Sequence, residues 1–342
     1  MSDARLIGSD IPLAERYDLA LVDLDGVAYK GHEPIAGASA GLAGARAAGM
    51  RLVFVTNNAS REPESVAEQL TGLDIPAQAG DVMTAAQACA QLLGTRLAPG
   101  SKVLVVGGAG MHTAVREAGF TIVESADDRP DAVAQGFAPE LGWAQLAEAA
   151  YAVAGGAWFV ASNLDLSLPT ARGFAPGNGA LVGTVTAATG IRPDSAGKPA
   201  STMYELAVER LGASNPLVVG DRLDTDLAGA RSGGYAGLHV LTGVSTGRDD
   251  VLADPGFRPH YIAADLGELL VPHPTPTPVA DGWWQVRESA ARVVDRRLEL
   301  HGVEGRDRGV DLIRAACAAA WEAVDSGHGL DVDSVPDLPV DN

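Results

Sequence analysis

A short apolar run that ends in acidic residues constrains the fold of this chain more than any other segment. Residues 19–24 read Leu-Ala-Leu-Val-Asp-Leu, and Asp25-Gly26 follows directly. The apolar residues predict a buried strand, and aspartate is uncommon in strands and costly to bury unpaired. Since alternate residues of a strand point to the same side, Asp23 and Asp25 can address one site together. Two such carboxylates indicate a divalent cation site or a nucleophile beside a proton carrier, and a plain aspartate turn is the alternative.

Polar turns recur where predicted strands of the first third of the chain end. Strands are predicted at residues 19–24 and 51–55, and helices at 38–48 and about 63–70. This order predicts a parallel sheet with helices on both faces. Ligands bind such sheets at the carboxyl ends of the strands, where Asp23 and the turn Thr56-Asn57-Asn58 both fall.

The alternating pattern restarts near residue 85. Further strands are predicted at residues 103–106, 132–134, 158–161, 217–220, 235–241 and 260–263, with helices at 111–118, 143–153, 203–211 and 224–231. A buried strand ending in acidic residues returns only at 217–220, so we interpret the middle segment as an insertion. We predict a core of residues 1–84 and 195–270 and an inserted α/β cap of residues 85–194.

The C-terminal part has a different composition. Four prolines within residues 271–278 favour extended chain, which predicts a linker at 271–281. Beyond it we predict a helical appendage at residues 282–342 with two amphipathic helices. The apolar residues taken to define them are Val286, Ala290, Val293 and Leu298 for the first, and Val310, Ile313, Cys317, Trp321 and Val324 for the second.

Charge and composition exclude several classes of partner. The 25 basic and 44 acidic residues give a net charge of −19, which argues against binding to nucleic acid or anionic membranes. Only two cysteines occur, Cys89 and Cys317, both in helix-like stretches, which predicts buried thiols. No signal peptide or apolar run of membrane-spanning length is evident, so we expect a cytoplasmic protein.

Two further polar segments fall beside predicted strands or helices. Gly197-Lys198-Pro199 precedes the helix at 203–211, and residues 220–226 read Gly-Asp-Arg-Leu-Asp-Thr-Asp after a buried strand. A lysine in a turn is usually only solvated, and Asp224 fits a helix N-cap. The acids of the last segment would nevertheless repel one another unless a cation or base lay close by.

In this order the four segments resemble the haloacid dehalogenase superfamily. The chain looks most like its NagD-type branch of Mg²⁺-dependent phosphatases, whose cap is inserted between the second and third motifs. The resemblance covers about residues 15–270. It implies an α/β fold: a doubly wound parallel-sheet core with an inserted α/β cap, to which this chain adds the small C-terminal helical appendage.

The resemblance implies roles for the acidic residues. Asp23 matches the nucleophile that attacks phosphorus, and Asp25 the general acid/base, whose backbone carbonyl also binds the metal. Asp221 matches the carboxylate ligand of Mg²⁺, so that Asp23, Asp25 and Asp221 form the implied metal site. Asp226 matches an acid that orders the ligand and the metal-bound waters.

The remaining motifs match residues that handle the phosphate and the leaving group. Thr56 and Asn57 match the phosphate-gripping motif, and Lys198 the charge-neutralising lysine. A cap loop with an Asn-x-Asp sequence closes over the active site in this family. By that likeness Asn163, Asp165 and Arg172 are expected to face the substrate, although a glycine-rich turn with a helix cap is the alternative reading.

These likenesses imply a phosphatase for a small phosphorylated metabolite, acting through an aspartyl phosphate. The appendage favours glycerol 3-phosphate as the substrate, with phosphoglycolate, pyridoxal phosphate and nucleotides as alternatives. A phospho-aspartate signalling protein and an inactive binding protein are the alternatives of other classes. A homo-oligomer formed through the cap or the C-terminal helices is left open.

Overall fold

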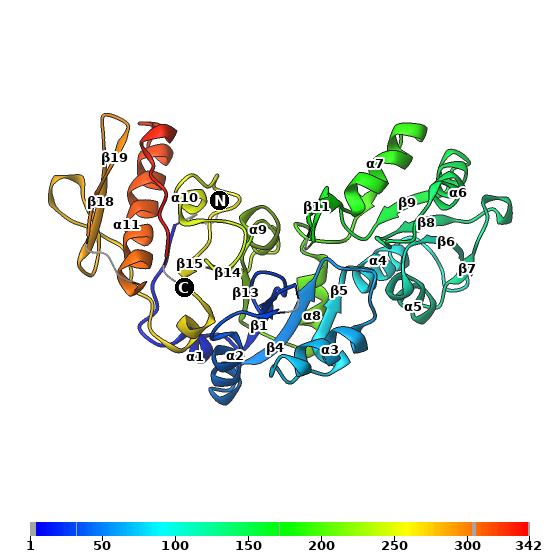
Figure 1. Ribbon diagram of the computed structural model, residues 1–342, viewed down its shortest axis with the longest axis horizontal. Helices are drawn as coiled ribbons and strands as arrows, with labels where there is room; N and C mark the ends of the chain where they lie inside the picture. The colour runs from blue at the N-terminus through cyan, green and yellow to red at the C-terminus, as the bar shows by residue number, and fades with distance from the viewer. Residues whose placement is uncertain (1–4, 32, 171, 303–305, 341–342) are drawn as a thin grey trace. The chain divides into compact units, whose positions relative to one another are not determined.

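The computed structural model describes residues 5–31, 33–170, 172–302 and 306–340. The chain divides into two compact units, Met1–Val53 with Leu211–Asn342, and Phe54–Arg210 (Figure 1). The predicted insertion, residues 85–194, lies entirely within the second unit, which also includes residues 54–84 and 195–210.

A six-stranded sheet has the order β15-β14-β13-β1-β4-β5. Its strands are β1 (Leu19–Val22), β4 (Arg51–Thr56), β5 (Val82–Thr84), β13 (Pro216–Gly220), β14 (Ala236–Val240) and β15 (Tyr261–Ala263). Strand β1 pairs in parallel with β13, and β13 with β14, so segments far apart in the chain lie in one sheet. All four residues of β1 are fully buried, which explains why this strand is apolar throughout. Strand β4 begins in the first unit and ends in the second.

Two helices of the first unit match predictions: α2 (Ala38–Ala47) the one at 38–48, and α9 (Ala228–Ser232) the second half of the one at 224–231. The unit also contains α1 (Leu13–Arg16), α10 (Gly247–Val251), η4 (Leu266–Leu270) and a hairpin of β2 (Tyr29–Lys30) and β3 (Glu33–Pro34), which were not predicted. The helix predicted at 224–231 begins as a wide π-helical turn, η3 (Leu223–Leu227). In that turn the N–H of Leu227 donates to the carbonyl of Arg222, five residues earlier, at 3.2 Å.

The second unit contains a parallel sheet of its own, with the order β12-β9-β8-β6-β7. Its strands are β6 (Lys102–Val106), β7 (Thr121–Val123), β8 (Ala132–Gln135), β9 (Trp158–Ala161) and β12 (Asp194–Ser195). Helices α4 (Ala85–Gly94) and α5 (Ala109–Glu117) pack together on one face, and α6 (Trp143–Ala154) and α7 (Asn178–Thr189) on the other (Figure 1). The remaining elements of this part of the chain are α3 (Pro63–Gly72), η1 (Ala79–Asp81), η2 (Ala126–Asp128), the hairpin β10 (Ser167–Thr170) and β11 (Gly173–Pro176), and α8 (Thr202–Leu211).

The prediction of a first C-terminal helix, from Val286 to Leu298, is wrong. Residues 277–301 contain an antiparallel sheet of β16 (Thr277–Pro278), β17 (Trp284–Val286), β18 (Ser289–Val294) and β19 (Arg297–His301). The short helix η5 (Ala280–Gly282) lies between β16 and β17, and η6 (Val332–Ser334) lies further along the chain. The two-residue turn Asp295-Arg296 joins β18 to β19 with φ of 49° and 65°. Such a turn joins hairpin strands with the right twist, but its usual residues are Asn and Gly. The helical spacing of apolar residues from Val286 to Leu298 was therefore coincidental.

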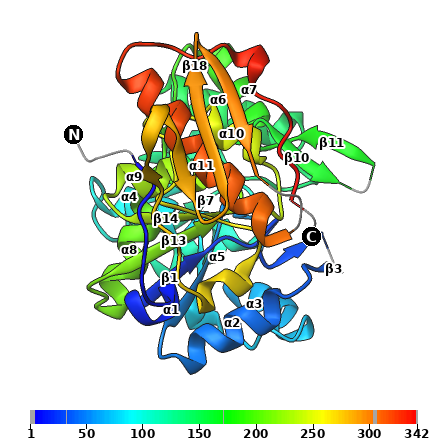
Figure 2. The same ribbon diagram turned by 90° about the vertical axis from the view of Figure 1, so that its left-hand side faces the viewer.

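The second predicted helix is confirmed as α11 (Arg306–Asp325). Its apolar face is buried against β17 and β18, and Figure 2 shows the helix lying along β18. Val310, Ile313, Cys317 and Trp321 are buried, whereas Val324 is exposed. Cys317 and Cys89 are both free thiols in helices, as predicted.

The predicted linker is extended but packed against the first unit. His273 is buried, its backbone forms a β-bridge with Ser9, and its Nε2 lies 2.9 Å from the carbonyl oxygen of Glu268. The prolines thus fix an extended path without leaving the segment free. In the part of the chain described, no helix is both long enough and apolar enough to cross a bilayer.

Candidate active site

Three carboxylates meet beyond two neighbouring strands of the first unit. Asp23 follows β1, and Asp221 and Asp226 follow β13; the N–H of Asp23 donates to the carbonyl of Val219 at 2.8 Å, which holds the two strand ends together. One oxygen from each of the three carboxylates lies within 4.8 Å of the other two. Asp221 is fully buried and Asp226 nearly so. The close approach predicted from the sequence for Asp23 and Asp221 is thus present.

Asp221 is held by the loop that follows β14. The N–H of Val244 donates to its Oδ2 at 2.7 Å, and the N–H of Ser245 donates to its backbone oxygen at 3.0 Å. Its Oδ1 is buried and has no hydrogen-bond partner among the described residues. A side chain at Gly26 or Gly243 would overlap the Asp221 carboxylate, so both positions require glycine. One carboxylate oxygen therefore remains available for a ligand.

The electrostatics of this cluster favour a cation. Burial, followed by the negative charges of Asp23 and Asp226, raises the pKa of Asp221 to about 7, against the opposing effects of the Val244 N–H and His239. Ionised carboxylates at this spacing repel one another unless a positive charge lies between them. A divalent ion with oxygen ligands would satisfy both the repulsion and the unpartnered Oδ1.

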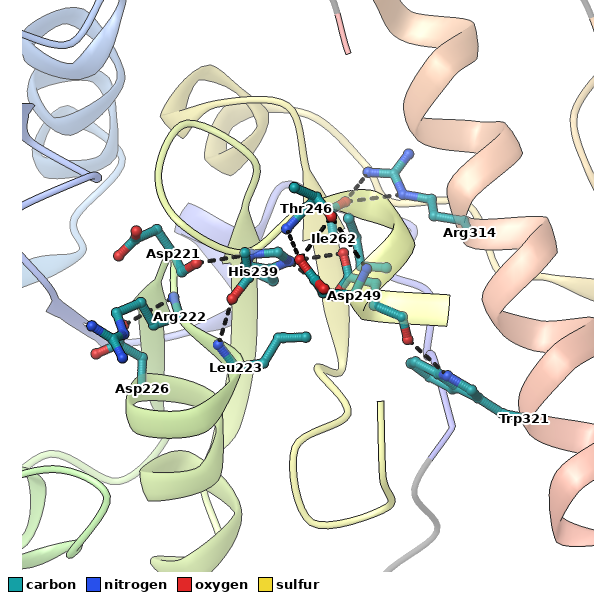
Figure 3. A network of polar contacts seen from close by, with 12 residues as sticks. Asp221, Arg222, Leu223, Asp226, His239, Thr246, Asp249, Ile262, Arg314 and Trp321 are labelled. Atoms are coloured by element: carbon teal, nitrogen blue, oxygen red, sulfur yellow. Dashed lines mark hydrogen bonds and ion pairs between the residues drawn. The ribbon is translucent and has the colours of Figure 1, made fainter. Parts of the chain in front are cut away.

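The carboxylate cluster contains the side chain of Asp226 and not that of Asp25. The Asp25 side chain is exposed, and it is Asp226 that supplies the third carboxylate of the cluster. The Oδ2 of Asp226 also accepts the N–H of Arg222 at 3.2 Å (Figure 3). After Asp25 the chain turns, and Thr242 Oγ1 donates to the Gly26 carbonyl at 2.6 Å, which fixes this turn against the loop after β14. An exposed Asp25 can exchange protons with a bound molecule or with water.

In the second unit, hydrogen bonds of Asn57 link the turn at residues 56–58 to the segment at residues 197–199. The N–H of Lys198 donates to Asn57 Oδ1 at 2.9 Å, and Asn57 Nδ2 donates to the Lys198 carbonyl at 3.3 Å. The Lys198 side chain is buried, and its Nζ lies 3.4 Å from the carbonyl oxygen of Val55. Thr56 is buried at the end of β4, and its Oγ1 accepts the N–H of Asn58 at 3.1 Å. A buried lysine and a strand-end hydroxyl suit an anionic ligand.

The predicted cap residues divide into two groups. Asn163 Nδ2 donates to the Asn57 carbonyl at 2.7 Å, and Asp165 Oδ2 accepts from Asn57 Nδ2 at 3.0 Å. The N–H of Asp165 in turn donates to Asn163 Oδ1 at 3.2 Å. These two residues therefore hold Asn57 in place. Arg172, by contrast, is exposed between β10 and β11.

The loop of residues 242–245 was missed from the sequence. It follows the apolar strand β14 and contains Thr242, Gly243 and Ser245, the kind of polar turn that identified the other strand ends. A search for polar residues directly after the predicted strand at 235–241 would have identified this loop. His239 and Asp250, described below, carried no such signal because they lie inside a strand and a helix.

Comparisons with known proteins identify the class. A model of haloacid dehalogenase-like hydrolases matches residues 20–121, and a second HAD-hydrolase-like model matches residues 195–269. The chain belongs to the haloacid dehalogenase-like hydrolase family, which confirms the predicted superfamily and fold. The unmatched residues between the two models fall within the second unit.

Named relatives of this chain are phosphatases. It is 43% identical to the D-glycerol 3-phosphate phosphatase of Mycobacterium tuberculosis, over 91% of this chain and 88% of that protein. It is 37% identical to an acid sugar phosphatase of Staphylococcus aureus, over 75% of this chain and 98% of that protein. The crystal structure of the M. tuberculosis glycerol phosphate phosphatase in complex with magnesium has a TM-score of 0.83 at 41% identity, covering 92% of this chain and 93% of that chain.

Proposed function

We propose that this chain is a Mg²⁺-dependent phosphatase that hydrolyses glycerol 3-phosphate to glycerol and phosphate. The observation that carries the proposal is the 43% identity to a D-glycerol 3-phosphate phosphatase along 317 residues. An alignment of that length extends beyond residue 270 into the C-terminal segment, whereas the acid sugar phosphatase relative matches 258 residues. The substrate of the relative that shares the C-terminal segment is therefore the better guide.

Asp23, Asp221 and the backbone carbonyl of Asp25 would hold the Mg²⁺, with Asp226 ordering ligands and water around it. The unpartnered Oδ1 of Asp221 and the three converging carboxylates fit such an ion. Mg²⁺ accepts few carboxylates and takes phosphate oxygens and water as its other ligands. When bound, it would offset the repulsion between the phosphate dianion and the Asp23 carboxylate.

In the proposed reaction a carboxylate oxygen of Asp23 attacks phosphorus and forms an aspartyl phosphate. The bond from phosphorus to the glycerol oxygen breaks, and Asp25 protonates the departing alkoxide. Asp25 then takes a proton from water, which attacks the phosphoryl group and restores the Asp23 carboxylate with release of phosphate. The exposure of Asp25 supports this role, because it must reach both the leaving group and the water.

Thr56, Asn57 and Lys198 would bind the transferred phosphoryl group. Lys198 would place a positive charge beside its oxygens, and the Thr56 hydroxyl and Asn57 amide would orient it. The paired hydrogen bonds between Asn57 and Lys198 support a fixed arrangement of these groups. We propose that Asn163, Asp165 and Arg172 face the substrate from the cap and help to select the leaving group; the first two also bond Asn57.

A substrate panel tests the proposal. The rate of phosphate release would be measured with Mg²⁺ for glycerol 3-phosphate, a hexose phosphate, phosphoglycolate, pyridoxal phosphate, a nucleoside monophosphate and 4-nitrophenyl phosphate. We expect kcat/KM to be highest for glycerol 3-phosphate and activity to vanish with a chelator. A higher kcat/KM for a sugar phosphate would overturn the substrate assignment, and activity that persists in the chelator would overturn the metal. Such a metabolite enzyme is expected in the cytoplasm.

A further inference from the structure

A buried histidine–aspartate pair lies between the Asp221 backbone and helix α11 of the C-terminal segment. His239 is on β14 and Asp250 on α10, and both are fully buried. The Nδ1 of His239 lies 2.9 and 2.8 Å from the two carboxylate oxygens of Asp250. Its Nε2 lies 3.2 Å from the backbone oxygen of Asp221 (Figure 3). The imidazole thus joins an acidic side chain to the backbone of the residue that carries the unpartnered carboxylate oxygen.

The hydrogen positions in this pair follow from its acceptors. A backbone carbonyl oxygen can only accept, so the Nε2 of His239 must carry the hydrogen that faces Asp221. The proton between Nδ1 and the Asp250 carboxylate is shared, and the pair is neutral overall whichever partner holds it. His239 therefore donates to Asp221 whichever placement holds.

Asp250, the acidic member of the pair, is held by a contact from α11. Trp321 Nε1 donates to the Asp250 backbone carbonyl at 3.0 Å (Figure 3). The guanidinium of Arg258 lies 5.1 Å from the Trp321 ring centroid and is paired with Asp325 at 2.6 Å. A Cβ at Gly247 would overlap the Ile313 side chain, so α10 and α11 are in close contact. The position of Asp250 is consequently fixed by the packing of α10 against α11.

The hydrogen bond from His239 is one of three that restrict the movement of Asp221. The Asp221 backbone oxygen accepts hydrogen bonds from His239 Nε2 and the Ser245 N–H, and its Oδ2 accepts one from the Val244 N–H. These three donors leave only Oδ1 without a partner among the residues described. Removing the His239 donor would leave the N–H of Ser245 as the one donor to the Asp221 backbone oxygen among the described residues, so the peptide group could shift and change the direction of Oδ1.

We propose that His239 and Asp250 are positioning residues that aim the Oδ1 of Asp221 at the metal ion. The inference rests on the proposed function, because it takes Asp221 to be a ligand of Mg²⁺. Neither residue touches the reacting atoms; both act through Asp221. Residues that orient metal ligands in this way typically change metal affinity about 10- to 100-fold when they are replaced.

Two amide variants of His239 separate the two hydrogen bonds. In His239→Asn the shorter side chain ends where Nδ1 lies, so it can still bond Asp250 but cannot reach the Asp221 oxygen. In His239→Gln the amide nitrogen reaches the position of Nε2 and can still donate to Asp221. Mg²⁺ affinity would be measured by titration calorimetry without substrate, with circular dichroism and thermal melting to confirm folding.

We expect His239→Asn to weaken Mg²⁺ binding about tenfold and His239→Gln to stay within about threefold of the original protein. The kcat of His239→Asn should recover when Mg²⁺ is saturating. His260→Asn is the matched control, because Nδ1 of His260 accepts from the N–H of Gly237 at the opposite end of β14, away from Asp221. It should change thermal stability but leave Mg²⁺ affinity unchanged.

The outcomes distinguish this inference from the proposed function. If the original protein binds no Mg²⁺, the proposed function itself fails. If it binds Mg²⁺ and both His239 variants bind with the same affinity as the original, the positioning role is overturned. Should His239→Asn not fold, Trp321→Phe provides the second test, since it removes a single N–H and should also weaken Mg²⁺ binding; unchanged affinity there would contradict the proposal.

Discussion

The backbone N–H of Val244 donates to Oδ2 of Asp221 at 2.7 Å, and this bond makes the loop after β14 part of the candidate site. It occupies one carboxylate oxygen and leaves the other, Oδ1, without a partner among the described residues. The direction in which Asp221 presents a ligand atom is therefore set by a peptide group in the loop that follows a neighbouring strand. Substitutions in this loop should affect metal binding although no side chain of the loop is a ligand.

Gly243→Ala tests that relationship. A Cβ at this position would overlap Asp221 Oδ2, so the loop or the carboxylate must shift, at a cost of about 1–3 kcal/mol. We expect Mg²⁺ affinity, measured by calorimetry, to fall about tenfold. Gly183→Ala in α7 is the control, since nothing lies within 4 Å of a Cβ there and alanine favours helix. Equal Mg²⁺ affinities for both variants would contradict the importance of the loop.

Asn57→Asp tests the junction between the second and third motifs. Aspartate keeps the shape of the side chain but cannot donate to Asp165 or to the Lys198 carbonyl, and it faces the Asp165 carboxylate. The lost bonds and the repulsion amount to about 2 kcal/mol, so kcat/KM should fall about 30-fold. The comparison is Asn58→Ala, an exposed neighbour that should keep most of the activity. A wild-type kcat/KM for Asn57→Asp would argue against this assignment.

Polar residues that directly follow an apolar strand could be identified as site residues from the sequence. Asp23, Thr56 and Asp221 each follow an apolar run that is buried in the sheet, so their positions could be inferred from local pattern alone. Asp226 was predicted only as an acid that orders the ligand and the metal-bound waters; its membership of the carboxylate cluster depends on the wide turn η3, which local sequence does not reveal.

Other features depend on tertiary contacts or on unusual turn residues. The pairing of His239 with Asp250 joins a strand to a helix eleven residues later, inside an apolar background that gives no polar pattern. The sheet of residues 277–301 was missed because Asp295-Arg296 forms a hairpin turn without the usual Asn or Gly. Side-chain spacing in short strands can then match the helical period by chance.

His273 predicts a loss of stability in acid. Burial, followed by the positive charge of Arg314, lowers its pKa from 6.5 to about 4. Below pH 6.5 the unfolded chain takes up a proton that the folded protein does not, so stability is complete above pH 6.5 and falls as the pH drops towards 4. The shift corresponds to roughly 3 kcal/mol across that range.

Urea unfolding of His273→Gln at pH 7 and pH 5 measures this effect. The glutamine amide can keep the hydrogen bond that Nε2 makes to the Glu268 carbonyl and does not titrate, so the stability of this variant should change less between the two pH values than that of the original protein. His328→Gln is the control, because His328 is exposed. If the two variants show the same pH dependence, burial of His273 does not contribute to acid sensitivity.

The most direct measurement of the central claim is phosphate release from glycerol 3-phosphate, with Mg²⁺, by the original protein and by Asp23→Asn and Asp224→Asn. Asp224 lies in the last motif but is exposed and bonded to Arg222, so its replacement should leave most activity intact. An amide cannot act as the attacking carboxylate, and Asp23→Asn should lose activity by about 10³-fold or more while remaining folded. Substantial Mg²⁺-dependent turnover by Asp23→Asn would contradict the account.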